Sequence, residues 1–272
     1  MTYLPILVII FQAGLVFGCG YKTWPTPEGD DVKVDNPQQV PKYYDGQMKR
    51  HVSAKGQIGI PSPKPSLKEG VPALFELADG AVIKNVVIGK KGADGIHCLG
   101  SCRIENCWWE YVGDDAATFL GKAGDTYHVS GGGAKNALNK VFQHDGGGTA
   151  IIENFQVENF AKLWLSCGNC LSNGANGPRK ANINCVIAKG PGETLAGTLG
   201  NYNDSATITN VQVEGYLQDV CQVYVGNNQE KPNCCPVHET AAQDGDGKNC
   251  IYKKSDITTK PSFLGSLLSS LT

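Results

Sequence analysis

The sequence has no large net charge of either sign. Its 24 Lys and Arg side chains nearly balance 26 Asp and Glu side chains, which leaves a formal net charge of −2 over 272 residues. A strongly basic surface is the electrostatic signature of proteins that bind nucleic acid or anionic membranes. The composition therefore argues against both partners, and a polyanionic ligand would have to be held by local cations or by a metal ion.

The chain also lacks an apolar run long enough to span a bilayer, which takes about 20 residues. Its most apolar stretch, Leu4–Phe17, carries no charge and is followed by the small residues Gly18 and Gly20. A short apolar run at the extreme N-terminus is typical of a secretory signal peptide, although no Lys or Arg precedes this one. We expect residues 1–18 to be a signal peptide cleaved after Gly18 or after Gly20, and the mature protein to be secreted and extracellular.

Cysteine, in contrast, is abundant, with eleven residues. Disulfides persist in the oxidising compartments that exported proteins enter, so the pairs Cys167/Cys170 and Cys234/Cys235 are interpreted as disulfide cysteines rather than as redox or zinc sites. Eleven is odd, and cleavage after Gly20 would leave ten by removing Cys19. We favour that count, which allows up to five bridges of unknown connectivity. The triplet Asn203–Ser205 is a glycosylation sequon at Asn203.

Helical periodicity is weak, and 34 glycines argue against long helices. Residues 21–70 are rich in proline and polar residues, which predicts an irregular lead-in. From Phe75 onward, short β-branched runs alternate with clusters of Gly, Asn and Asp. This pattern predicts one all-β domain over residues 21–253 and a C-terminal tail, 254–272, that either caps the domain or is disordered.

A tripeptide that begins with isoleucine recurs along this domain. Its copies are Ile83-Lys84-Asn85, Ile104-Glu105-Asn106, Ile152-Glu153-Asn154, Ile183-Asn184-Cys185 and Ile208-Thr209-Asn210. The isoleucines are 21, 48, 31 and 25 residues apart. If the gap of 48 holds two turns, with Tyr127–Val129 in the unmarked one, the period is about 25 residues, which is typical of a solenoid.

This repeat predicts a parallel β-helix stapled by disulfides. Each turn would contribute a short strand that pairs with its equivalents in the neighbouring turns, about 4.8 Å away. Successive isoleucines would stack inside, and the asparagines at the following bend would form a ladder. A β-sandwich is the alternative, but it predicts hairpins and gives no reason for one tripeptide to recur at a nearly constant period.

Acidic residues occur at matching places on two successive turns. Asp94 and Asp115 are 21 residues apart, as are Ile83 and Ile104, so one turn should place Asp94 beside the Asp114-Asp115 pair. Carboxylates that close repel one another unless a cation lies among them, and Ca²⁺ prefers such hard oxygen ligands. Asp is also common in ordinary turns, but the shared register favours a calcium site.

A set of lysines follows, namely Lys122, Lys135, Lys140 and Lys162. Lys140 and Lys162 are 22 residues apart, so we expect them to stack as well. Repulsion between stacked ammonium groups lowers their pKa, which is one way that a lysine becomes a general base. A solvated basic face is the alternative for any single lysine of the set.

Several segments, taken together and in order, resemble polysaccharide lyase family 3, the small secreted pectate lyases. They are Gly92–Cys102, Trp108-Trp109-Glu110, Asp115–Phe119, Lys140–His144 with Gly146–Thr149, and Ser166–Cys170. The resemblance extends from about Trp24 to about Ile251. It implies a right-handed parallel β-helix that cleaves de-esterified pectate (polygalacturonate) by β-elimination, with Ca²⁺ bridging protein and substrate carboxylate. We expect a monomer that binds this polymer and neither nucleic acid nor membrane.

The resemblance also assigns roles to individual residues. Asp94, Asp114 and Asp115 match the family's calcium ligands, Lys140 matches its proposed base, and Lys162 stands beside Lys140 in the catalytic set. Glu69 and Lys122 match substrate-binding positions.

The sequence departs from the family pattern at two of these places. Asp114 replaces a glutamate, and Leu165 replaces an arginine of the active cleft. The missing guanidinium predicts reduced activity, unless Arg179 substitutes for it as a substrate-binding residue.

Two other functions remain open besides a pectate lyase. One is a catalytically impaired protein of the same fold that only binds pectate, and the other is a secreted coil with a purely structural role. A polygalacturonase would need a Gly-His-Gly motif, whereas His144 stands between Gln143 and Asp145.

Overall fold

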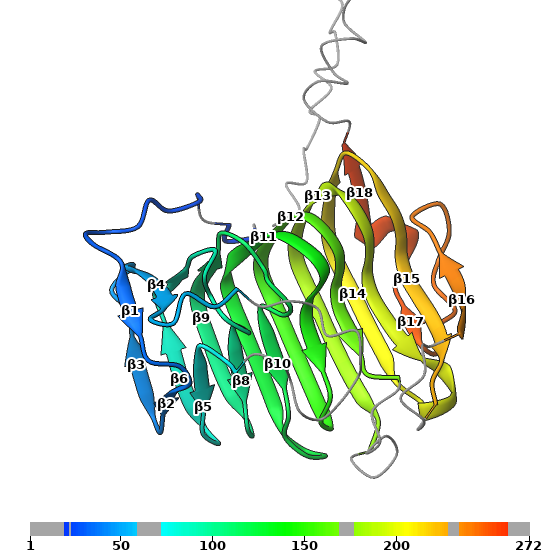
Figure 1. Ribbon diagram of the computed structural model, residues 1–272. Coiled ribbons are helices and arrows are strands. Elements are labelled where there is room, and N and C mark those ends of the chain that lie inside the picture. Colours follow the sequence, from blue (N-terminus) through cyan, green and yellow to red (C-terminus); the bar gives the residue numbers. More distant parts are fainter. Residues whose placement is uncertain (1–18, 22, 59–71, 169–176, 228–233, 261–272) are drawn as a thin grey trace, which may run out of the picture.

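The computed structural model describes residues 19–21, 23–58, 72–168, 177–227 and 234–260. The predicted signal peptide, Glu69, Cys170 and the tail beyond residue 260 lie outside the described residues. The strands follow one another along the molecule in sequence order, from β1 to the last turns (Figure 1). The described residues include no helix that is both long and apolar enough to cross a membrane.

Each turn of the chain contributes strands to three rows of parallel neighbours. The first row holds β2 (Gln38–Val40), β5 (Phe75–Leu77), β8 (Ile96–Cys98), β10 (Ala117–Phe119) and β15 (Leu217–Val225). The second holds β3 (Tyr43–Asp45), β6 (Ala81–Lys84), β14 (Ser205–Glu214) and β17 (Cys250–Ile251). The third holds β1 (Val32–Val34), β4 (Arg50–Ser53), β7 (Val87–Ile88) and β18 (Ile257–Lys260).

Five longer strands join these rows. β9 (Cys102–Trp109) and β14 each run from the second row into the third. The strands β11 (Thr126–His144), β12 (Gly148–Ser166) and β13 (Arg179–Leu199) each run from the second row through the third into the first. Every described strand pairing is parallel except the one between β15 and β16 (Cys234–Glu239). Two short 3₁₀ helices, η1 (Gly200–Tyr202) and η2 (Lys254–Asp256), complete the elements.

The recurring isoleucines stack in the second row, as the repeat predicts. Ile83 pairs with Ile104, which pairs with Val129, and Val129 pairs with Ile152. The same column continues through Ile183 to Ile208. All of these side chains are fully buried. The predicted turn without an isoleucine therefore exists and contains Val129, and the all-β parallel coil is confirmed.

The bend after each isoleucine requires a left-handed backbone conformation. The third residue of each tripeptide has φ between 52° and 54°, and Gly131 takes this place in the turn of Val129. Asparagine tolerates this region better than most residues with a side chain. Asn106 also donates from its amide to Asn85 Oδ1 at 2.8 Å, which confirms the predicted ladder for that pair.

Disulfides tie the coil together, but the cysteine left unpaired is not the one that we expected. Described bridges join Cys19 to Cys185, Cys98 to Cys102, and Cys221 to Cys250, and Cys167 is disulfide-bonded too. Cys107 is a free, fully buried thiol. Among the described cysteines, the unpaired one is therefore Cys107 rather than Cys19, because Cys107 is buried in the coil interior and Cys19 is bonded to Cys185.

Candidate active site

The two acidic positions meet where the first row begins. Ile96 pairs with Ala117, so Asp94 and Asp115 occupy equivalent places two residues earlier on neighbouring turns. The backbone N–H of Asp115 donates to Asp94 Oδ1 at 3.2 Å. Both side chains are buried, with 2% and 4% exposed. The predicted register between these acids is confirmed.

Lys140 reaches this acidic group from the next turn. Its ammonium lies 3.0 Å from Asp115 Oδ1 and 3.5 Å from Asp114 Oδ1. Lys140 also pairs with Lys162 across β11 and β12, as the spacing of 22 residues predicts. The Lys162 ammonium has a partner of its own, because it donates to Glu193 Oε2 at 2.6 Å.

The predicted lowering of the lysine pKa is wrong for Lys140. Burial disfavours its charge, but attraction by Asp115, Asp114 and Asp145 together outweighs burial and raises the pKa of the ammonium. Burial also raises the pKa of Asp115 to about 7; Lys140 opposes this shift and Asp114 adds to it. Stacking two lysines therefore does not make Lys140 neutral, because attraction by the surrounding carboxylates stabilises its charged form.

His97 belongs to the same group, although no sequence pattern singled it out. Its Nε2 lies 2.9 Å from Asp94 Oδ2, and only 7% of the residue is exposed. The two oxygens of Asp94 are thus held by a ring nitrogen and by the Asp115 N–H. The only available signal was the spacing of three residues between Asp94 and His97, which becomes a contact only because β8 starts between them.

The acids match calcium in chemistry but do not form a closed cage. No group of three or more acidic, histidine or cysteine side chains has metal-site geometry among the described residues. Asp114 and Asp115 nevertheless converge on a positive charge, the Lys140 ammonium, with Asp94 adjacent. Carboxylate oxygens are the ligands that Ca²⁺ prefers. The residues therefore fit a calcium ion whose charge would replace that of the ammonium and whose coordination a ligand would complete.

Leu165 lies on the same row of strands as the acids and lysines. It pairs with Gln143 of β11 and Gly197 of β13, and Gln143 pairs with Thr118 of β10. Leu165 is half-buried. A Cβ on Gly197 would meet the Leu165 side chain at 2.5 Å, so the leucine covers the space that Gly197 leaves open.

Other predicted residues lie apart from this group. Lys122 is exposed in the loop between β10 and β11. Lys135 packs over the Trp24 ring at 4.3 Å and pairs with Glu158 at 3.3 Å. Asn203 is exposed directly after η1, where a glycan could be attached. Glu69 lies outside the described residues.

Arg179 is fully buried, which argues against the predicted substrate contact. Its guanidinium donates to the carbonyls of Gly146 at 2.7 Å and Asp145 at 2.7 Å. Its backbone N–H donates to Asp204 Oδ1 at 2.8 Å. Arg179 therefore fixes the turn between β11 and β12 from inside the protein, and it does not replace the missing guanidinium at Leu165.

Comparison with solved structures relates this coil to polysaccharide-degrading enzymes. Pel3 from Pectobacterium carotovorum superimposes with a TM-score of 0.68 at 30% identity, covering 88% of this chain and 74% of that one. PelI from Erwinia chrysanthemi, solved in complex with tetragalacturonic acid, gives a TM-score of 0.63 at 31% identity, covering 83% and 71%. Both are pectate lyases.

Sequence comparison gives the same result. The pectate lyase family model matches residues 21–231. A probable pectate lyase E from Aspergillus flavus is 40% identical, covering 85% of this chain and 83% of its own. Pectate lyase H from Emericella nidulans is 39% identical with coverages of 85% and 84%. The chain therefore belongs to the pectate lyase family and is an enzyme of the polysaccharide lyase class.

Proposed function

We propose that this protein is a secreted, calcium-dependent lyase that cleaves de-esterified pectate by β-elimination. The observation that carries the proposal is the contact of Lys140 with Asp114 and Asp115. It brings a proton acceptor and a carboxylate group suited to Ca²⁺ together on one row of strands. The complex of the related PelI with tetragalacturonic acid supports a galacturonate polymer as the substrate.

The chain's own residues divide the chemistry between them. A bound calcium ion would supply positive charge to a substrate carboxylate and stabilise the charge that develops when the neighbouring carbon loses its proton. Asp94, Asp114 and Asp115 would hold that ion, and His97 keeps Asp94 oriented. A cation held by these acids would offset their attraction for the Lys140 ammonium and so favour its neutral form. The neutral Nζ of Lys140 would be the group that accepts the proton.

Lys162 and Leu165 modulate this activity. Lys162 lies one turn beyond Lys140 and is held by Glu193, so its ammonium offers a fixed positive charge to the polymer. Leu165 offers no hydrogen-bond donor where the resemblance expects a guanidinium. We therefore propose a lyase with reduced turnover, and the alternative is a protein of this fold that binds pectate without cutting it.

The disulfides support export. Bridges persist in oxidising compartments. Three described bridges, and a further bonded cysteine at Cys167, are spread along the chain from Cys19 to Cys250. Since Cys19 bonds to Cys185, a signal peptide cleaved after Gly18 would retain this bridge, whereas cleavage after Gly20 would remove it. We accordingly propose secretion with cleavage after Gly18.

Ultraviolet absorbance of unsaturated uronide tests the proposal directly. We expect purified protein to form this product from polygalacturonate with calcium, and to lose turnover and the calcium-dependent part of its binding in excess chelator. Asp115→Ala should reproduce the effect of the chelator. Asp30→Ala, which removes an exposed carboxylate elsewhere, should behave as the parent. Undiminished turnover in chelator would remove the metal from the proposal, and retention of the polymer without product would favour the binding protein.

A further inference from the structure

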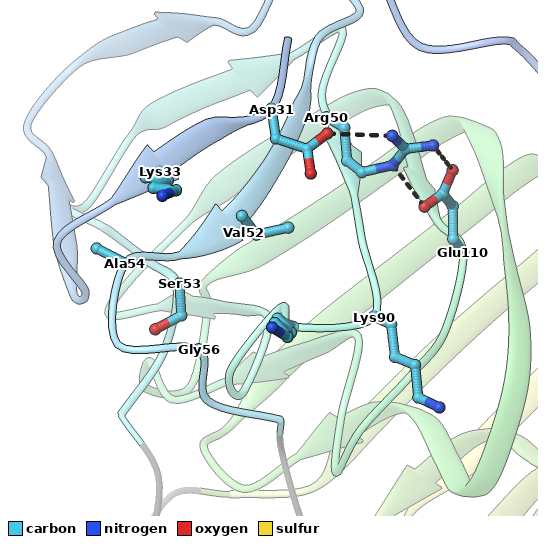
Figure 2. Close-up of a pocket in the computed structure, with 10 residues that line it drawn as sticks. Asp31, Lys33, Arg50, Val52, Ser53, Ala54, Gly56, Lys90 and Glu110 are labelled. Atoms are coloured by element: carbon cyan, nitrogen blue, oxygen red, sulfur yellow. Dashed lines mark hydrogen bonds and ion pairs between the residues drawn. The ribbon is translucent and has the colours of Figure 1, made fainter.

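A second charged feature lies on the third row of strands, away from the acidic group. It is a pocket of about 490 Å³ (Figure 2) lined by Asp31, Lys33, Arg50, Val52, Ser53, Ala54, Gly56, Lys90, Lys91 and Glu110. β1 and β4 form one wall, and the segments that follow β7 and β9 form the other. We refer to it below as the basic pocket.

The basic pocket has more positive than negative side chains. Arg50 engages both of its carboxylates, with two hydrogen bonds of 2.8 Å to Glu110 and one of 3.1 Å to Asp31, as Figure 2 shows. These contacts raise the pKa of Arg50 and fix the guanidinium as part of the wall. Four cations against two carboxylates leave an excess of positive charge, supplied by the exposed Lys33, Lys90 and Lys91.

The pocket is connected to the candidate active site through the backbone. The Ser53 N–H donates to the Lys91 carbonyl at 2.7 Å, and the Ala93 N–H donates to the Gln57 carbonyl at 3.1 Å. Lys91 and Asp94 are three positions apart in the chain, so their Cα atoms are at most roughly 11 Å apart. A polymer held at the acidic group is thus within reach of the pocket.

We propose that the basic pocket is an accessory site for the carboxylates of a uronate oligosaccharide. The excess of ammonium groups suits a ligand that repeats a negative charge, and Val52 and Ala54 offer small apolar surface for a sugar ring. The proposal rests on the proposed function for the source of the ligand, but binding at the pocket needs neither calcium nor Lys140. Its role is to retain long substrate beside the site of cleavage.

Binding to a catalytically disabled protein tests this site separately. The probe is a galacturonate oligomer of six units, titrated calorimetrically into Asp115→Ala protein in chelator at low salt. We expect measurable binding, and roughly tenfold weaker binding when Lys33, Lys90 and Lys91 are all changed to alanine, since each exposed contact contributes modestly. The matched control changes Lys42, Lys180 and Lys248 to alanine, which removes the same charge from exposed positions elsewhere.

The outcomes separate the accessory site from the proposed function. No binding in chelator, or an equal loss in the matched control, would overturn the accessory site. Displacement of the oligomer by sulfate of the same total charge would show a general anion site and would also overturn it. If the parent protein binds the oligomer but forms no unsaturated product, the accessory site would be supported and the proposed lyase activity would be contradicted. In the active parent, the pocket variant should raise KM for long polymer and leave kcat for a trimer unchanged.

Discussion

Two stacks of polar side chains run along the same coil, and their hydrogen bonds and charges are compensated in different ways. At the bends after the isoleucines, Asn106 donates to Asn85, and Asn210 donates at 2.8 Å to Asn184, which lies one residue before the bend of the preceding turn. Where the first row begins, Asp94, Asp115, Lys140 and Lys162 occupy successive turns instead. The geometry of stacking is shared, but the chemistry of the stacked groups is not.

An amide carries both donors and an acceptor, so identical amides can bond to one another turn after turn. A carboxylate only accepts and an ammonium only donates, so a charged stack must alternate in sign or recruit a counterion. In this coil the sign of the stack changes once, where Lys140 lies against Asp114 and Asp115, and Glu193 supplies a counterion for Lys162. The amide stack stabilises the fold, whereas the charged stack holds the groups to which we assign metal binding and proton transfer.

Removing Lys140 should have the largest effect on the charged stack. We expect Lys140→Ala to lose turnover by about 10²–10⁴-fold, the usual contribution of a general base, while calcium-dependent binding of pectate persists. Initial rates of unsaturated product and calorimetric binding measure the two effects. Lys135→Ala is the matched control, because Lys135 is also ion-paired but lies on the third row. Equal losses in the two variants would contradict a role for Lys140 as the base.

Adding a cation at position 165, next to the same charged stack, should increase turnover. An arginine there could extend over Gly197 and donate to a substrate carboxylate. We expect Leu165→Arg to raise turnover by about 10²–10³-fold, the effect typical of one electrostatic contact of this kind. Leu138→Arg is the control, since Leu138 is exposed on β11. A fully active parent with no gain from the arginine would show that the guanidinium is dispensable.

When no calcium is present, the ionised Asp115 should lower the stability of the folded protein. Its pKa is raised from its ordinary value to about 7, so the folded protein binds this proton more tightly than the unfolded chain. Its ionisation therefore reduces stability as pH rises from about 4 to about 7. In chelator, Asp115→Asn should gain on the order of 1–4 kcal/mol over the parent at pH 7, and the gain should shrink toward pH 4. Urea unfolding across this range measures it, and a constant difference would argue against the raised pKa.

The amide stack should respond in a smaller and pH-independent way. Asn106 bonds to Asn85, accepts a hydrogen bond from Trp108 Nε1 at 3.1 Å, and has φ of 52°. We expect Asn106→Ala to cost about 1–3 kcal/mol, because it removes these bonds and strains the backbone. Asn106→Gly keeps the left-handed conformation accessible, so it should cost less. Equal costs in denaturant unfolding would assign the whole effect to the lost amide.

Much of this protein is determined by the period of its sequence. Stacked strands need matching residues at matching places, so the spacing of Ile83 and Ile104 fixed the register, and with it the meeting of Asp94 with Asp115. The same logic placed Val129 in the unmarked turn and Lys162 beside Lys140. The contacts of a repeat can be predicted from its sequence spacing because each turn contacts only its neighbours.

Only the tertiary structure decided which groups neutralise which. His97 holds Asp94, Glu193 holds Lys162, and the acids raise rather than lower the pKa of Lys140. Arg179 is buried and Cys19 is bonded to Cys185, and the sequence spacing of these residues predicted neither contact. Register says which residues are adjacent along the coil. Loops of unequal length determine where a side chain points at a bend and which charge it contacts there. These loops have no sequence period from which either could be predicted.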